Sequence, residues 1–232
     1  MVSKRELDPS TQNAASRAYE YLLQQTVTFG IRPGDRVNEV QIAAALNMSR
    51  APVREALNRL VTQGLVRSEG GKGFFGRKLS ATELAELMEV RSDLEVSATR
   101  RVCQHASDEQ LEELAATSKE RRIDPETMTI DEMVALDEEF HLAIAATSGN
   151  AERVKVLENI NHRIQFVRRI TLEQGDRSKE VIREHDDIIA AIQARDTERA
   201  IALTEKHLQV NSSNFIDNLQ EGLARIYSDV LA

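Results

Sequence analysis

The chain has 232 residues, of which 41% are hydrophobic, 29% charged and 4% aromatic. This composition is typical of a folded globular protein and excludes disordered, collagen-like and low-complexity classes. The apolar runs fall well short of the about 20 residues that span a bilayer, and the first residues lack the apolar core of a signal peptide. The single cysteine, Cys103, excludes an intramolecular disulfide. We therefore expect one large or two modest domains, a cytoplasmic location and no membrane partner.

Charge divides the chain into a basic head and an acidic body. Residues 1–78 contain twelve basic and seven acidic residues, a balance of +5, whereas the whole chain has a net charge of −8. Such asymmetry favours a polyanion-binding head, although it also arises by chance. The absence of Trp disfavours aromatic platforms for single strands or RNA, so double-stranded DNA is the expected polyanion.

The basic head predicts three helices followed by a hairpin. Helical spacing runs over residues 15–29 and stops at Gly30. Asn38 with Gln41 three residues later indicates the N-terminus of a short second helix, and Ser49 is a good N-cap for a third helix that ends near residue 63. Two extended stretches then flank the glycine-rich turn 70–73. Residues 1–78 are therefore predicted to form a winged helix-turn-helix DNA-binding domain.

Residues 79–232 are predicted to form an all-helical domain. No strand pattern occurs there, and Ser80 with Glu83 and Thr129 with Glu132 have capping-box spacing. The expected helices cover residues 81–105, 108–122, 130–148, 151–173, 177–194 and 197–228. The predicted fold is mainly α: a winged helix-turn-helix followed by an antiparallel six-helix bundle.

The third predicted helix has the two faces that a DNA-reading helix needs. Its apolar stripe is made by Val53, Leu57 and Leu60. Beside the stripe lies a polar ridge of Arg50, Arg54 and Asn58. Arginines near the N-terminus of such a helix bind guanine edges or phosphates, and Lys72 and Gly73 in the hairpin turn allow a close approach to the backbone of DNA. The alternative is a winged helix that contacts only proteins and leaves these arginines solvated.

The residues of this region resemble the GntR family of bacterial transcription regulators. The similarity covers about residues 13–78 and includes Pro33-Gly34-Asp35-Arg36-Val37-Asn38-Glu39, Ile42-Ala43, Ser49-Arg50-Ala51-Pro52-Val53-Arg54-Glu55-Ala56-Leu57 and Gly64-Leu65-Val66. The resemblance implies a homodimer on a short palindromic operator. The candidate DNA-binding residues are Ser49, Arg50, Arg54, Asn58, Lys72, Gly73 and, where some relatives have an arginine, Gln41.

Three histidines of the body lie on inward-facing stripes of three different predicted helices. They are His141, His185 and His207, and Asp137 precedes His141 by one helical turn. One carboxylate and three neutral imidazoles suit a first-row divalent metal ion with open coordination positions. For each histidine taken alone, a hydrogen-bonded core residue is the competing interpretation.

Residues from about 80 to 228 resemble the FCD ligand-binding domain of the FadR-like branch. The resemblance rests on the segment 89–95, Asp137-Glu138-Glu139-Phe140-His141, Glu184-His185-Asp186 and His207. It implies that Asp137, His141, His185 and His207 hold zinc, nickel or a similar ion. Six helices rather than seven resemble the VanR-like subgroup.

Four further residues are candidates for binding a small carboxylate effector. Arg91 lies on the apolar stripe of its helix, and a buried guanidinium needs an anion. That anion is either an effector or an internal Glu or Asp. Asn161, Arg168 and Asn211 fall on or near inward stripes and are expected to line the cavity that would hold this effector.

These patterns predict a DNA-binding transcriptional repressor whose operator binding is modulated by a small organic acid at the metal site. In the alternative, the metal ion itself is the signal. An enzyme is not expected, because Glu138-x-x-His141 lacks the second Glu-x-x-His of a di-iron bundle and no His-Glu-x-x-His motif occurs.

Overall fold

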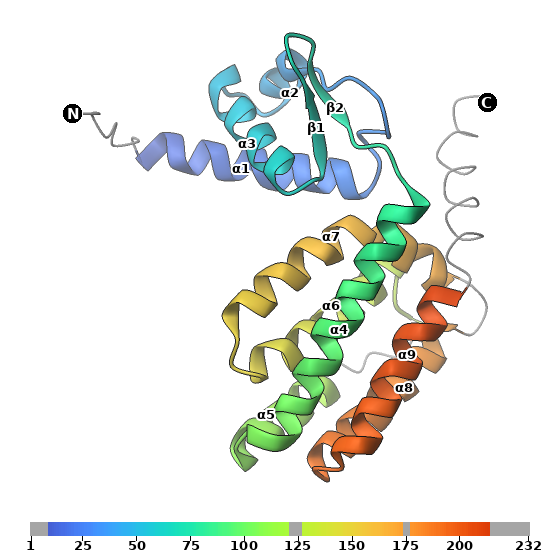
Figure 1. Ribbon diagram of the computed structural model, residues 1–232. Coiled ribbons are helices and arrows are strands. Elements are labelled where there is room, and N and C mark those ends of the chain that lie inside the picture. Colours follow the sequence, from blue (N-terminus) through green and yellow to red (C-terminus); the bar gives the residue numbers. More distant parts are fainter. Residues whose placement is uncertain (1–8, 121–126, 174–176, 214–232) are drawn as a thin grey trace. The chain divides into compact units, whose positions relative to one another are not determined.

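A computed structural model describes residues 9–120, 127–173 and 177–213. The chain divides into two compact units between residues 79 and 80 (Figure 1). Nine helices and one two-stranded sheet occur in this part of the chain. The predicted fold class, mainly α with a winged helix-turn-helix ahead of a helical domain, is confirmed.

The first unit is a winged helix-turn-helix. Its helices α1, α2 and α3 cover Pro9–Val27, Glu39–Ala45 and Arg50–Thr62, and its strands β1 and β2 cover Val66–Glu69 and Gly73–Gly76. The strands pair antiparallel, with the turn 70–72 between them. This hairpin is the wing.

The apolar stripe of α3 holds the first unit together. Val53, Leu57 and Leu60 are 0% exposed and belong to a core that α1 and the wing complete, the wing through Phe74. Full burial of each aliphatic side chain contributes about 1.5–3 kcal/mol. With this side buried, the polar ridge of α3 is directed to solvent.

The end of α1 differs from the prediction. Helical spacing was expected to continue to Phe29, but α1 ends at Val27 and Phe29 has a φ of 59°. The Ile31 N–H donates to the Gln25 carbonyl, which closes the last turn of the helix. A residue in the left-handed region commonly ends a helix in this way, and here that residue is Phe29 rather than Gly30.

The second unit is a helical bundle of six helices within the described ranges. They are α4 (Ala81–His105), α5 (Asp108–Glu120), α6 (Ile130–Thr147), α7 (Ala151–Glu173), α8 (Arg177–Gln193) and α9 (Thr197–Ser213). Helix α4 packs against α6, α7 and α9, and α8 packs against α5 and α9. The expected continuation of the last helix to residue 228 lies outside the described residues. Among those residues, no helix is both long and apolar enough to cross a membrane.

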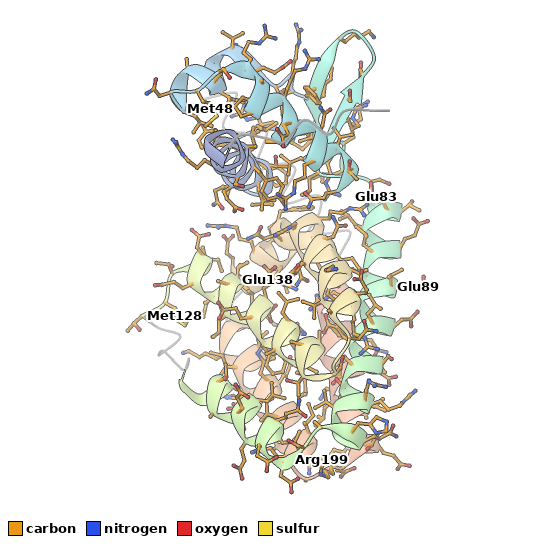
Figure 2. All side chains as sticks on the ribbon, turned by 90° about the vertical axis from the view of Figure 1, so that its left-hand side faces the viewer. Met48, Glu83, Glu89, Met128, Glu138 and Arg199 are labelled. Atoms are coloured by element: carbon orange, nitrogen blue, oxygen red, sulfur yellow. The ribbon has the colours of Figure 1, made fainter. Side chains whose placement is uncertain are left out.

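Local capping signals begin these helices where the sequence predicts. The Ser80 hydroxyl accepts the Glu83 N–H, and Thr129 and Glu132 form a complete capping box at the start of α6. Side chains fill the space between the helices of each unit, and Glu89 projects outward from α4 (Figure 2). The buried face of α4 contributes Arg91, Glu95 and Thr99 to the polar interior of the bundle.

Candidate DNA interface and metal centre

The predicted DNA-reading residues lie on α3 and its N-terminus, on the wing and, for Gln41, on α2. Their side chains are exposed at Ser49, Arg50, Arg54, Asn58, Gln41 and Lys72, and Gly73 is half-buried. Ser49 has the extended backbone of an N-cap, but its hydroxyl makes no capping hydrogen bond. This face therefore presents hydrogen-bond donors of several kinds to solvent.

Glu39, at the start of α2, lies against two arginines of α3, Arg50 and Arg54. One of its oxygens is 3.6 Å from Arg54 Nε and 3.8 Å from Arg50 Nη2, while both arginine side chains are 58% exposed. These separations exceed a normal charge-assisted hydrogen bond. The Arg54 guanidinium also lies 5.9 Å from the centre of the Phe74 ring. These internal contacts orient the two arginines, but both guanidinium groups can still bind another molecule.

The tip of the wing is a tight turn. The Lys72 N–H donates to the Glu69 carbonyl, and the Lys72 ammonium is 3.6 Å from the Glu69 carboxylate. Gly71 and Gly73 have φ values of 73° and 105°, a region that favours glycine. Without side chains at these positions, the wing backbone can approach another surface closely.

The four predicted metal-ligating residues come together inside the bundle. Asp137 and His141 lie on α6, His185 on α8 and His207 on α9, and one ligand atom from each lies within 4.8 Å of all the others. The Nε2 atoms of His141 and His207 are 3.2 Å apart, and Nε2 of His185 is 3.3 Å from Asp137 Oδ1. All four side chains are buried.

Two glutamates orient the histidines of this cluster from outside. Glu95 on α4 lies 2.5 Å from Nδ1 of His141, and Glu184 on α8 lies 2.6 Å from Nδ1 of His207. A carboxylate at Nδ1 places the ring proton there and leaves the lone pair on Nε2, the atom that faces the cluster. The arrangement is that of a carboxylate–histidine pair behind a metal ligand.

Electrostatics keep the cluster ready to bind a cation. Burial lowers the pKa of His185 from 6.5 to about 3, although Asp137 acts in the opposite direction. Burial also lowers the pKa of His207. Burial alone would raise the pKa of Asp137, but Arg168 and His141 outweigh it and hold that pKa well below its usual range. Two of the imidazoles are therefore neutral near pH 7 and the carboxyl group is ionised.

The balance between burial and nearby polar groups also sets the ionisation of the two outer glutamates, Glu95 and Glu184. Burial would raise the pKa of Glu95, but the charge of Arg91 and the hydrogen bonds from His141 and Arg91 hold it far below its usual range. Burial also opposes ionisation of Glu184, whose pKa is nevertheless lowered to about 2 by His207 and Arg177. Both glutamates are therefore ionised near pH 7.

The donor set fits a first-row divalent ion. Three imidazole nitrogens and one carboxylate oxygen are the ligands that zinc and nickel accept. Nε2 of His185 is buried and, although it lies 3.3 Å from Asp137 Oδ1, it makes no aligned hydrogen bond within the described residues. A buried nitrogen without a partner is costly, and a bound cation removes that cost.

A cavity of about 330 Å³ extends from the cluster between α4, α6 and α7. It is lined by Met88, Arg91, Asp137, Ile164, Val167, Arg168, Thr171 and Leu172. Arg91 donates from Nε to Glu95 at 2.6 Å, so the internal salt bridge considered from the sequence is present. Arg168 Nε lies 2.8 Å from Asp137, and its Nη2 donates to Asn161.

Three of the four predicted effector-binding residues are thus neighbours of this cavity. Arg91 and Arg168 line it, and Asn161 contacts Arg168. Asn211 lies on α9, but its side chain is outside the described part of the structure. Sequence reasoning gave no role to Glu95 or Glu184. Glu95 follows Arg91 by one helical turn, a signal that could have paired the two, whereas Glu184 meets His207 only through the packing of α8 on α9.

A wing, a DNA-reading helix and an all-helical second domain define a transcription regulator of the winged helix-turn-helix class. The family model for bacterial regulatory proteins of the gntR family matches residues 14–75, and that for the FCD domain matches residues 86–210. The chain therefore belongs to the GntR family and carries an FCD domain, as the sequence resemblance predicted.

Relatives and solved structures agree with this assignment. The chain is 37% identical to the Nta operon transcriptional regulator of Aminobacter aminovorans over 202 residues, which cover 87% of this chain and 94% of the relative. It is 26% identical to the transcriptional repressor RspR of Escherichia coli over 95% of this chain and 96% of the relative. The E. coli McbR/YncC structure has the same fold, with a TM-score of 0.74 at 22% identity over 94% of this chain and all of that one.

Proposed function

We propose that this GntR-family regulator is a repressor that binds a palindromic operator as a homodimer and is released by a small organic acid bound beside a divalent metal ion. The observation that carries the proposal is the convergence of Asp137 and three histidines from α6, α8 and α9 within 4.8 Å. The cluster is buried next to a cavity that contains two guanidinium groups.

The DNA-reading half of the proposal rests on exposure and charge. Arg50 and Arg54 project from a helix whose other side is locked in the core, so they can reach base edges and phosphates in the major groove. Asn58, Gln41 and the Ser49 hydroxyl are further donors on the same surface, while Lys72 and the Gly73 backbone suit a phosphate or the minor groove.

Asp137, His141, His185 and His207 would hold the ion. A divalent ion at these ligands supplies a Lewis acid for the oxygens of an acid ligand. Glu95 and Glu184 direct the Nε2 atoms of His141 and His207 inward, and the ionised Asp137 adds one negative charge. Zinc and nickel are the ions that this nitrogen-rich donor set favours.

The acid would bind in the cavity of about 330 Å³, where Arg91 and Arg168 supply positive charge. Binding there joins groups from α4, α6 and α7. An acid that binds one arrangement of the dimer more tightly shifts the population toward it, and with it the spacing of the two DNA-reading units.

The test uses full-length protein and an operator duplex selected from a randomised pool. Metal content is measured first, and DNA binding is then followed by fluorescence anisotropy for protein as purified, after chelation, and after reloading with zinc or nickel. Each state is titrated with a panel of small organic acids. Asp137→Ala is compared with Asp131→Ala, which changes an exposed carboxylate on the same helix.

The proposal is supported if an acid releases DNA from metal-loaded wild type and from Asp131→Ala. The same acid should not release DNA from chelated protein or from Asp137→Ala. Release by the metal alone identifies a metal sensor instead. If chelation and Asp137→Ala both leave the response to every acid unchanged, the cluster has no part in sensing.

A further inference from the structure

We propose that Arg91 and Arg168 form an anion subsite of their own, next to the cluster of Asp137 and the three histidines, so that the effector is a short acid with two oxyanion groups. One group faces the cluster and the other faces the guanidinium pair. The inference rests on the proposed function, because it names the class of acid that the same cavity accepts.

Unpaired donors around this cavity are the first observation. Nη2 of Arg91, Nη1 of Arg168 and Nδ2 of Asn161 are buried and have no hydrogen-bond acceptor in the described part of the chain. A buried donor left without an acceptor destabilises the folded protein. Two of the three donors belong to arginines that line the cavity and the third to Asn161, which contacts Arg168, so the cavity offers a place for an acceptor that the described residues do not supply.

The carboxylates beside these arginines are already shared, which is the second observation. Glu95 contacts Arg91 with one oxygen and His141 with the other. Asp137 contacts Arg168 with one oxygen and turns the other toward His185. Neither carboxylate is therefore available to satisfy the outer nitrogens of the guanidinium groups.

The two guanidinium groups also repel each other. Both side chains are buried and line the same cavity, and each keeps a nitrogen without an acceptor within the described residues. The additional carboxylate near Arg168, that of Glu138, is 3.9 Å away and partly exposed. A negative group placed between two buried like charges relieves this repulsion and gains charge-assisted hydrogen bonds.

The position of Arg91 separates the two subsites. Arg168 contacts the cluster residue Asp137 directly, whereas Glu95 and the ring of His141 stand between Arg91 and the cluster atoms. An acid with one carboxylate can bind either at the cluster or at the Arg91 guanidinium group. An acid with two carboxylates can bind at both.

The walls of the cavity limit what joins the two groups. Apolar side chains of Met88, Ile164, Val167 and Leu172 line it, and its volume is about 330 Å³. These aliphatic walls favour an apolar, aliphatic link between the two groups of the acid. A larger cavity of about 540 Å³ between α5, α6 and α8 has no lysine or arginine in its lining, so it does not offer the same chemistry.

The test is isothermal titration of zinc-loaded, full-length protein after removal of free zinc. Succinate and glutarate are compared with butanoate and pentanoate, which have the same chain lengths and one carboxylate. We expect each dicarboxylate to bind at least about tenfold more tightly than its partner, as one additional charge-assisted contact predicts. Arg168→Gln should reduce this preference to under about threefold, whereas Arg169→Gln, a half-exposed neighbour on α7 that does not line the cavity, should retain it.

Wild-type selectivity decides the proposal even if Arg168→Gln does not fold, and circular dichroism shows whether it does. Equal affinities for mono- and dicarboxylates overturn the anion subsite but leave the proposed function intact, because acids still bind. If none of the four acids binds zinc-loaded protein, the anion subsite is overturned. The operator-release experiment then tests the proposed function separately. If well-folded Arg168→Gln still prefers dicarboxylates, that result also contradicts the anion subsite.

Discussion

The two domains each contain a pair of arginines beside carboxylates, but the pairs differ in burial. In the DNA-reading domain, Arg50 and Arg54 share the carboxylate of Glu39 at 3.8 and 3.6 Å, and both are 58% exposed. In the FCD domain, Arg91 and Arg168 are buried and lie 2.6 and 2.8 Å from two different carboxylates, those of Glu95 and Asp137.

Burial decides what each pair can bind. Exposed arginines with long, shared contacts retain their hydration and can exchange Glu39 for the phosphates or bases of a large polyanion. Buried arginines have lost their water and can meet only a ligand small enough to enter a cavity. The same side chain thus serves an external macromolecule in one domain and an internal small molecule in the other.

The largest expected effect comes from a substitution that breaks the buried ion pair of Arg91 and Glu95. Glu95→Gln removes the carboxylate from between Arg91 and His141 and leaves a buried positive charge without compensation. We expect the free energy of unfolding to fall by about 3–5 kcal/mol, measured by urea denaturation of metal-free protein. Glu89→Gln, on the exposed face of the same helix, should change it by less than about 0.5 kcal/mol. Equal stability of the two variants would contradict a tightly coupled buried pair.

Acid should act on the same buried network. The pKa of His185 is about 3 in the folded protein against 6.5 for the free side chain, so the unfolded chain binds more protons between these values. The stabilisation from neutral His185 is complete above pH 6.5 and is lost as the pH falls toward 3. Melting temperatures of metal-free protein should therefore decrease steadily from pH 7 to 4. His185→Gln should flatten that decrease, and an unchanged slope would argue against a buried neutral ring.

The exposed pair should affect DNA and not stability. Arg54→Ala should weaken binding to a selected operator by about 1–3 kcal/mol if the side chain contacts a base, as fluorescence anisotropy would show. Its free energy of unfolding should change by less than about 0.5 kcal/mol. Arg183→Ala, an exposed change in the FCD domain, serves as the control for overall charge. Operator affinity equal to that control would remove Arg54 from the DNA interface.

The smallest expected effect concerns Glu39. Glu39→Gln removes the internal anion that competes with DNA for Arg50 and Arg54. We expect affinity for a random-sequence duplex to rise a few-fold, by less than about 1 kcal/mol, with a smaller gain for the selected operator. Binding is compared with Glu20→Gln, an exposed change on α1, over a range of salt concentrations. A loss of affinity for both duplexes would show that Glu39 positions the arginines rather than competing for them.

Local signals explain why much of the fold was predictable. The bounds of α4 and α7 agree with the predicted 81–105 and 151–173, because capping residues and breaks in the helical pattern lie next to one another in the sequence. Phe29 shows the limit, since its left-handed backbone depends on the turn that follows and not on its own preference.

The candidate site was predictable only in part for a related reason. Inward-facing stripes indicated that Asp137 and the three histidines point into the bundle, and the family resemblance indicated their shared role. The contacts of Glu184 with His207 and of Arg168 with Asp137 connect different helices. Such pairs depend on how the helices pack, which periodicity within each helix does not determine.

One carboxylate, that of Asp137, belongs both to the proposed ion ligands and, through Arg168, to the proposed acid pocket. Two ligands that meet at one group must strengthen or weaken each other by equal factors. Cellular zinc or nickel supply would then set the concentration of metabolite at which the operator is vacated. Bacteria starved of the ion would respond as though the metabolite were scarce, so the regulator would report nutrient and trace-element status in a single output.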